Sequence, residues 1–373
     1  MIAGLAPEGA SILRRVARAC GAWLIGSCLA FVVIEGASSG LLLLNDLAGL
    51  ERVSERRHTR YDAELGWVNL PNVSIDGLYG PGTSFRTNSQ AFRNDLDFPV
   101  SVPEGKLRIV CSGDSFTLGY GVSNADAWCS RLSALDPSFE AVNMGQGGYG
   151  IDQAFLWYRR DGVRLEHQVQ LFAFNIEDFR RMQSDSFEGY GKPVLLLDGG
   201  RLVVDNVPVP RRAFYAPLWI DALPVIQQLR SYQLLRGLLG GLSPRREPTR
   251  RYGATRQVVA AVFESLRDLH QAAGSALVLV YLPMHSDWRS SADLRRLARQ
   301  EAARLGVWFF DLSEDFRGLP AEELEGLFIS DPELRGYGHY SRAGNDFVAR
   351  QLYSRLTELP VASGRASGSS RIR

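Results

Sequence analysis

The sequence has almost no excess charge and contains few histidines and cysteines. Across 373 residues, 42 lysines and arginines face 41 aspartates and glutamates, which leaves a formal net charge of +1. Binding to nucleic acid through its phosphates needs a basic surface, so near-neutrality argues against nucleic acid as a partner. The five histidines and four cysteines stand in no metal-ligand spacing, and no glycine-rich phosphate loop occurs. We therefore expect no metal and no cofactor.

Cysteines are scarce, and their positions leave two interpretations open. Cys20 and Cys28 lie in or beside an apolar segment, whereas Cys111 and Cys129 lie further along the chain. Cys111 and Cys129 could form a disulfide outside the cytoplasm. Cys111 is also on a predicted buried strand, where a separate thiol packs as a small apolar side chain.

The amino-terminal apolar segment predicts a membrane helix over residues 21–44. A spanning helix needs roughly 20 apolar residues, so this segment suffices only if the membrane tolerates Glu35, which interrupts it. An acidic side chain near a helix centre costs ~3 kcal/mol on insertion scales, which the surrounding leucines and valines offset.

Three arginines before the apolar run predict its orientation. They place residues 1–20 in the cytoplasm, 21–44 in the membrane as a signal-anchor, and the rest of the chain outside. The alternatives are a signal peptide cleaved near the small residues 36–39, which would release a secreted protein, and a cytosolic helix. The arginines are Arg14, Arg15 and Arg18.

Beyond residue 105, short apolar runs alternate with amphipathic helical patterns. Such alternation predicts an α/β domain with a parallel sheet that helices cover on both faces. Ligands bind to such sheets at the carboxyl ends of the strands. The predicted strands are 107–111, 141–143, 169–174, 276–283 and 307–312, and the predicted helices are 125–135, 151–160, 257–273 and 292–305.

An insertion over residues 185–255 interrupts this alternation. Asp198-Gly199-Gly200 between the runs 193–197 and 201–204 predicts a β-hairpin, and an apolar helical stretch over 223–239 follows it. An insertion of this size could form a lid or one wall of a substrate cleft. At the other end, the polar residues 361–373 predict a disordered tail.

Gly113-Asp114-Ser115 places a serine at the edge of the predicted sheet. It follows the strand 107–111, and helical periodicity resumes after it, so Ser115 lies near the amino end of a helix. There its hydroxyl is exposed, its own amide is free to donate, and partial positive charge favours a developing anion. The other interpretation is an ordinary helix N-cap.

A serine nucleophile needs a base, because its hydroxyl reacts poorly until a nearby imidazole accepts the proton. His339 precedes the last predicted helix and so lies at a sheet edge, and His285 after the strand 276–283 is the rival candidate. We interpret the remaining histidines as solvated, because they lie in basic or polar stretches: His58, His167 and His270.

These residues resemble the SGNH (GDSL) hydrolase superfamily, in which four short blocks contribute Ser, Gly, Asn and His on a flavodoxin-like sheet. Gly113-Asp114-Ser115 matches the first block, and His339 with Ser341 and Gly344 matches the fourth. The resemblance covers residues 106–360. It implies a flavodoxin-like three-layer fold with a five-stranded parallel sheet, to which the membrane helix and the hairpin and helix of the insertion are added.

The resemblance also implies roles for the first two blocks. Ser115 would be the nucleophile, His339 its base, and the Ser115 amide one donor to the oxyanion. For the second block, the family's spacing points to the Gly148 amide as another donor, with Gly145 and Gly147 as alternatives.

The third block departs from the family's Gly-x-Asn-Asp and runs Ala173-Phe174-Asn175-Ile176. A second register would place Glu177-Asp178 in the Asn-Asp position. A carboxylate cannot donate to an oxyanion, whereas an amide can, so we expect Asn175 to be the third donor. The other interpretation is that Asn175 only turns the chain after a strand.

The fourth block departs as well. The family carries an aspartate three residues before the histidine, and Gly336 stands there in this sequence. We expect Asp331 to supply the acid that orients His339, although Glu333 lies equally near. Without an acid, a backbone carbonyl would hold the ring in a Ser-His dyad.

The implied activity is hydrolysis of O-acyl esters, carried by a small molecule or an extracellular glycan. An O-acyltransferase that modifies an exported polysaccharide would use the same residues, and a catalytically inert glycan-binding module would share the fold. Within the accessory segment 45–105, residues 61–67 and 85–93 resemble stretches of membrane-attached bacterial members, which implies an inner-membrane anchor and a periplasmic domain. We expect this accessory segment to add strands and to shape the mouth of the cleft.

Overall fold

The computed structural model describes residues 8–47, 57–188, 190–209, 229–232, 234–235, 252–285, 291–331 and 334–360. Contacts divide the chain into two units. The smaller unit comprises Met1–Glu51 and Phe214–Arg246, and the larger comprises Arg52–Ala213 and Glu247–Arg373. The accessory segment therefore belongs largely to the same unit as the predicted catalytic domain.

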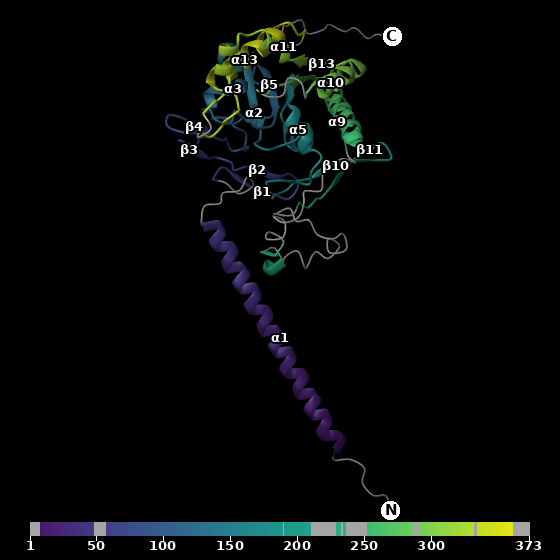
Figure 1. The fold of residues 1–373 in the computed structure, drawn as a ribbon. Helices are drawn as coiled ribbons and strands as arrows, with labels where there is room; N and C mark the ends of the chain where they lie inside the picture. The colour runs from purple at the N-terminus through teal and green to yellow at the C-terminus, as the bar shows by residue number, and fades with distance from the viewer. Residues whose placement is uncertain are drawn as a thin grey trace, which may run out of the picture. The chain divides into compact units, whose positions relative to one another are not determined.

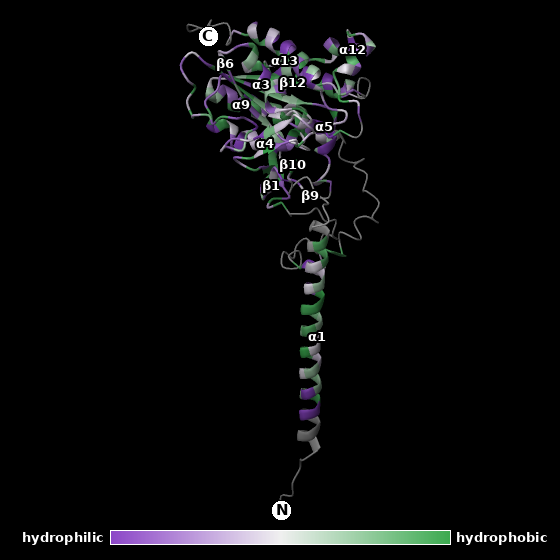
Figure 2. Cartoon of the chain, turned by 90° about the vertical axis from the view of Figure 1, so that its left-hand side faces the viewer, coloured by the Kyte–Doolittle hydropathy of each residue, from purple (hydrophilic) through white to green (hydrophobic). Residues whose placement is uncertain are grey.

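The smaller unit contains one long helix, α1 (Glu8–Leu47), of 40 residues. Within α1, the 29 residues Arg14–Leu42 are long and apolar enough to cross a membrane, by length and composition. Figure 2 shows α1 hydrophobic over its middle and hydrophilic towards its amino end. A membrane anchor and a signal sequence both have this pattern.

Glu35, the acidic residue within the apolar segment, has hydrogen-bond donors around its carboxylate. The Arg230 amide donates to Oε2 at 2.7 Å and the Ser231 amide to Oε1 at 3.1 Å. The Ser231 hydroxyl also donates to Oε1. An acidic group costs less to remove from water when donors satisfy its oxygens, so these contacts with the insertion would lower the cost of placing Glu35 in an apolar environment.

A five-stranded sheet forms the centre of the larger unit, with the order β13-β12-β7-β5-β6 and every pair parallel. Numbered along the chain this order is 2-1-3-4-5, which is the flavodoxin-like arrangement. The predicted fold class is confirmed. The strands are β5 (Leu107–Gly113), β6 (Phe139–Gly145), β7 (Val169–Phe174), β12 (Ala276–Tyr281) and β13 (Trp308–Asp311).

Helices cover both faces of this sheet because consecutive side chains of its strands are apolar and point to opposite faces (Figure 1). Val110, Phe172 and Leu279 face one core, and Ile109, Leu171 and Val278 face the other. The first core includes α4 (Ile151–Arg160), α9 (Tyr252–Ala273) and α10 (Ala292–Leu305), and the second includes α3 (Trp128–Leu135), α11 (Ser313–Arg317) and α13 (Arg342–Thr357). The short helices are α2 (Ser115–Leu118), α5 (Ile176–Arg181) and α12 (Ala321–Gly326).

Among the described residues, four antiparallel strand pairs accompany the central sheet. The predicted hairpin of the insertion forms as β10 and β11, whereas most of the predicted helix 223–239 and the predicted tail 361–373 lie outside the described residues. The pairs are β1 (Thr59–Asp62) with β2 (Gly66–Asn69), β3 (Ser74–Asp76) with β4 (Ser84–Arg86), β8 (Ser186–Phe187) with β9 (Tyr190–Gly191), and β10 (Val194–Asp198) with β11 (Arg201–Asp205).

A disulfide joins Cys111 on β5 to Cys129 on α3, with the two Cα atoms 6.2 Å apart. Of the two interpretations that the sequence left open, the structure therefore has the disulfide. Cys20 and Cys28 are free and exposed on α1. The bond closes a loop of 18 residues that includes the turn carrying Ser115.

The interpretation of three histidines as solvated is wrong. His58 and His270 are only 5% and 2% exposed, and His167 is partly buried. The Tyr158 hydroxyl lies 2.9 Å from His167 Nε2 and 3.2 Å from His270 Nε2, and His270 Nε2 lies 2.7 Å from Gln170 Oε1. Burial lowers the pKa of His270 to about 3, so this histidine is neutral and belongs to a buried polar network.

Candidate active site

Ser115 and His339 are hydrogen-bonded although 224 residues separate them in sequence. Ser115 Oγ lies 2.8 Å from His339 Nε2. Ser115 is the first residue of α2, directly after β5, and His339 lies in the loop before α13. The Phe116 and Tyr120 rings pack on the imidazole, with centroid separations of 4.7 and 5.1 Å. Two aromatic rings and the serine thus hold the imidazole in place.

The rival histidine, His285, is exposed and packs edge-to-face on Phe328, with ring centroids 5.2 Å apart. The hydrogen bond of the Ser115 hydroxyl to an imidazole goes to His339 instead. Of the two candidate bases, the structure therefore brings His339 to the serine.

Burial of His339 lowers its pKa below the ordinary histidine value. Asp114 raises this pKa, and so do the backbone carbonyls of Tyr337 and Gly336, whereas the Arg181 guanidinium lowers it. Burial outweighs the groups that favour the charged ring. His339 is therefore neutral, and able to accept a proton, at a lower pH than a solvated histidine.

The other ring nitrogen of His339 has no acid beside it in the part of the chain that the structure describes. Nδ1 is buried and forms no hydrogen bond of ordinary geometry with a described residue, but the backbone carbonyls of Tyr337 and Gly336 act on the ring and raise its pKa. Asp331, predicted to orient the ring, is exposed and forms no hydrogen bond with Nδ1. Glu333 lies outside the described residues. The structure thus brings Ser115 and His339 together, whereas no hydrogen bond joins Asp331 to the ring.

Gly336, where the resemblance places an aspartate, has no room for a side chain. A Cβ atom there would lie 2.7 Å from the Gly121 Cα and 2.9 Å from the Ile329 Cδ1. Its φ of +106° is also one that residues with side chains rarely adopt. The close approach of two glycine backbones therefore excludes an acid at this position.

Asp114, rather than Ser115, is the N-cap of α2. Its Oδ1 accepts the Phe116 amide at 2.9 Å. The capping interpretation of Gly113-Asp114-Ser115 is thus satisfied by the aspartate, and the Ser115 hydroxyl lies 2.8 Å from His339 Nε2 and 3.4 Å from Asp114 Oδ2. The Ser115 amide donates no hydrogen bond to another described residue. The Gly148 backbone amide likewise donates no hydrogen bond to another described residue, so both amides remain available as donors.

Gly113 is needed for space. Its φ is not positive, but a Cβ there would lie 2.4 Å from Thr117 Oγ1 and 2.6 Å from the Ala173 carbonyl oxygen. The end of β5 therefore lies directly against α2 and the end of β7.

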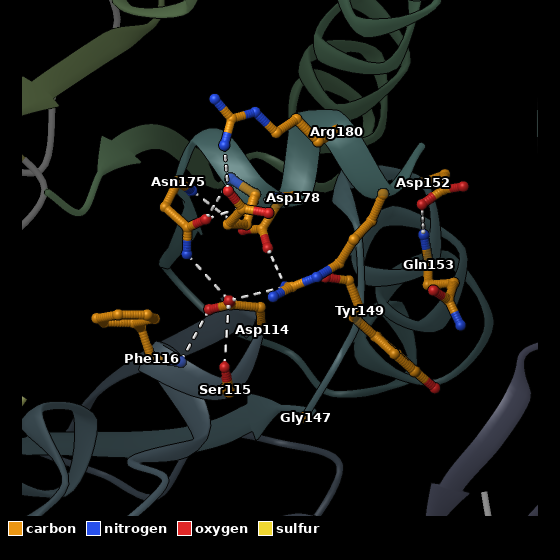
Figure 3. Close-up of polar contacts among 12 residues, drawn as sticks. Asp114, Ser115, Phe116, Gly147, Tyr149, Asp152, Gln153, Asn175, Asp178 and Arg180 are labelled. Carbon is orange, nitrogen blue, oxygen red and sulfur yellow. Dashed lines mark hydrogen bonds and ion pairs between the residues drawn. The ribbon is translucent and has the colours of Figure 1, made fainter. Parts of the chain in front are cut away.

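Asn175 turns the chain after β7, and its side-chain amide contacts the turn that carries Ser115. As the N-cap of α5, its Oδ1 accepts the amides of Glu177 at 2.8 Å and Asp178 at 3.3 Å. Its Nδ2 donates to Asp114 Oδ2 at 3.0 Å (Figure 3). These contacts fix the nitrogen end of the amide towards the turn that carries Ser115.

Gly148 lies in a turn that two neighbouring segments hold. Its φ is +79°, and a Cβ there would lie 2.6 Å from the Phe187 ring of β8. Trp67 of β2 donates from Nε1 to the Gly147 carbonyl at 2.8 Å, and the Tyr149 hydroxyl donates to the Trp67 carbonyl at 2.5 Å. The accessory segment and the insertion therefore both contact the turn that contains Gly148.

Arg93 is a second residue of the accessory segment, after Trp67, whose contact with the site the sequence did not reveal. Its buried guanidinium donates to three carbonyls of the loop after α2, those of Leu118, Gly119 and Val122. Burial lowers the pKa of Arg93. A single arginine in a polar stretch carries no periodic signal that distinguishes it from a solvated one.

The fold and the site together define a flavodoxin-like α/β protein with a serine and histidine pair at the carboxyl edge of the sheet. No family model matches the chain, and no curated protein matches it.

Several solved structures have a similar fold. A member of the lipolytic protein G-D-S-L family from Veillonella parvula is 12% identical with a TM-score of 0.39, over 68% of this chain and 100% of that one. A lipase/acylhydrolase from Enterococcus faecalis is 15% identical with a TM-score of 0.37, over 71% and 99%. An acetyl xylan esterase is 14% identical with a TM-score of 0.38, over 67% and 100%. Likeness at this level says nothing about activity.

The lowered pKa of His339 predicts the acidic limb of a pH profile. A general base must be neutral in the free enzyme, so kcat/KM falls as His339 gains a proton. Because its pKa is lowered, we expect the midpoint of this limb below about 6.5, the ordinary histidine value. Hydrolysis of an activated ester, measured from pH 4 upwards, checks this; a midpoint above that value would contradict it.

The packing at Gly336 predicts that an acid cannot be restored there. Gly336→Asp should unfold at a lower temperature, because backbone strain costs about 1–3 kcal/mol and the overlap with Gly121 adds to it. Gly338→Asp is the control, since Gly338 also has a positive φ but no atom within 4 Å of its Cβ position. Thermal unfolding of the detergent-solubilised proteins decides: equal stability of the two variants would refute the steric argument.

Proposed function

We propose that this chain is a serine-dependent ester hydrolase of the SGNH type, which acts on O-acyl groups of a small molecule or glycan outside the cytoplasm. The observation that carries the proposal is the 2.8 Å contact between Ser115 Oγ and His339 Nε2 at the carboxyl edge of the sheet. An inert module needs no such contact. The orientation of Asn175 towards the same turn adds support.

In the proposed reaction, Ser115 Oγ attacks the ester carbonyl while His339 Nε2 accepts the hydroxyl proton. The tetrahedral oxyanion receives hydrogen bonds from the amides of Ser115 and Gly148 and from Asn175 Nδ2. His339 then protonates the departing alcohol, which leaves an acyl-enzyme. Water attacks the acyl group with His339 again as base, and the acid and the free serine are released.

The proposal treats Ser115 and His339 as a dyad. In a triad, the acid orients the imidazole and stabilises its charged form. Here the rings of Phe116 and Tyr120 orient the imidazole, and Asp114 favours its charged form from the serine side. The dyad therefore has substitutes for both functions of an acid at Nδ1.

A serine-directed phosphonate tests the proposal. It should label the purified protein, and Ser115→Ala should abolish labelling because the modified oxygen is gone. Ser354→Ala, at an exposed position of α13, should label as the unchanged protein does.

Unlabelled wild type, under conditions that label a known serine esterase, would contradict the catalytic proposal and favour an inert glycan-binding module. Where labelling succeeds, an acetylated substrate distinguishes the acyl acceptors. Release of free acid supports the hydrolase, whereas transfer to an added glycan supports the O-acyltransferase.

For localisation, we infer that α1 is retained as an anchor and that the larger unit lies in the periplasm. The arginines before the apolar segment orient the helix with its amino end inside. The disulfide between Cys111 and Cys129 supports the same side, because such bonds persist in oxidising compartments.

Counting reactive thiols tests this localisation, and separates an anchor from a cleaved signal. Membranes are denatured without reductant and treated with a thiol-reactive mass tag. An exported, anchored chain should take two tags, at Cys20 and Cys28, and four after reduction. Cys129→Ala should take three without reduction, because Cys111 is then free.

Two other counts would contradict the inference. No tag before reduction and two after would show that the helix had been removed together with its cysteines. Four tags without reduction would show that the disulfide is absent, which removes the structural support for a periplasmic domain.

A further inference from the structure

Arg181 lies beside the proposed oxyanion site, in the last turn of α5, and belongs to none of the four sequence blocks. A single nitrogen, Nη1, lies within hydrogen-bonding distance of three acceptors. It is 2.8 Å from Asp178 Oδ1, 3.0 Å from the Tyr149 carbonyl oxygen and 3.2 Å from Asp114 Oδ2. One guanidinium therefore contacts three different segments of the chain.

Each acceptor belongs to a segment that carries one proposed oxyanion donor. Asp114 directly precedes Ser115 after β5, and Tyr149 directly follows Gly148 after β6. Asp178 follows β7, and its Oδ2 accepts a hydrogen bond from the Asn175 backbone amide at 3.0 Å (Figure 3). Beyond the strand ends, the Gln146 amide donates to the Gly113 carbonyl at 3.1 Å, and no other backbone hydrogen bond joins the described residues of these segments, so side chains contribute most of their mutual contacts.

Arg181 provides the positive charge that pairs with two buried acidic side chains, Asp114 and Asp178. The side chains of Asp114 and Asp178 are each 2% exposed, and Arg181 pairs with both. Burial raises the pKa of Asp178, and the Asp114 carboxylate raises it further, whereas Arg181 lowers it. Removal of the guanidinium would leave two carboxyl groups without a cation at the place where the oxyanion forms.

We propose that Arg181 is a positioning residue that holds the three oxyanion donors in their mutual geometry and offsets the carboxylates of Asp114 and Asp178. The inference rests on the proposed function and extends it to a residue outside the family pattern. Arg181 acts through Asp114, Tyr149 and Asp178 and contacts no reacting atom itself.

The Phe187 ring limits how the guanidinium can lie. The Arg181 Cζ lies 5.3 Å from the ring centroid, and the same ring packs on Gly148. A planar guanidinium can contact a ring face while its edge donates hydrogen bonds. The compact ammonium group of a lysine keeps the charge but cannot reproduce both contacts, so the two substitutions separate charge from geometry.

The experiment compares Arg181→Gln and Arg181→Lys with Arg180→Gln, a neighbour whose side chain is 52% exposed and paired with Glu177. We expect Arg181→Gln to lower kcat by about 10²–10³-fold, as the loss of an oxyanion donor does, with KM little changed. Arg181→Lys should lose less, and Arg180→Gln should equal the wild type. The phosphonylation rate of Ser115 should follow the same order.

The pH profile provides a readout that a merely structural role would not move. The charged and titratable groups around His339 are Asp114 after β5, Arg181 on α5 and Tyr120 after α2. The uncharged carbonyls of Tyr337 and Gly336, in its own loop, also act on the ring. Because Arg181 disfavours the charged imidazole, the acidic limb of kcat/KM should move to higher pH in Arg181→Gln and stay in place in Arg181→Lys.

The outcomes separate this inference from the proposed function. A wild type that the phosphonate does not label overturns both. A labelled wild type with folded Arg181 variants that keep its kcat, labelling rate and acidic limb overturns the inference alone. If Arg181→Gln does not fold, Arg181→Lys decides, because wild-type kcat in this variant would contradict a geometric role for the guanidinium.

Discussion

The candidate active site depends on the position of β5 between β6 and β7. Strand order reverses there, so the connections that leave β5 and β7 run over opposite faces of the sheet, through α3 and α9, and the carboxyl edge between these strands stays open. Ser115 follows β5, Gly148 follows β6 and Asn175 follows β7. Residues far apart in sequence meet at this edge because three adjacent parallel strands all end there.

Packing around this edge converts strand ends into a defined site. Gly113 lets β5 approach α2 and β7. Asp114 caps α2 through Oδ1 and accepts a hydrogen bond from the Asn175 side-chain amide at Oδ2. Arg93 holds the loop after α2, and Trp67 holds the turn at Gly147. The accessory segment is thus part of the framework of the site, which explains why it shares a unit with the sheet.

Much of this arrangement could be predicted from the sequence because it is periodic or local. The runs 169–174, 151–160 and 292–305 match β7, α4 and α10 residue for residue, since each is an apolar or amphipathic pattern with clear ends. Ser115 and His339 could be identified because a turn after a strand and a loop before a helix each have a local signature.

The parts that sequence could not predict depend on contacts between distant residues. His270 lies in a polar stretch, yet long-range packing buries it. Gly336, where the resemblance places an acid, has no room for a side chain because Gly121, 215 positions earlier in the chain, lies against it. Arg181 resembles its exposed neighbour Arg180 in sequence, and only the positions of its three acceptors distinguish it.

A double-mutant cycle on Ser115 and His339 tests the central claim most directly. Residues that act as one catalytic unit lose activity non-additively: either substitution alone should lower kcat by about 10⁴–10⁶-fold, and the two together by little more. We expect this result for Ser115→Ala, His339→Ala and the double variant, with a soluble activated ester as substrate. Independent, multiplicative losses, or a His339→Ala variant as active as the wild type, would contradict it.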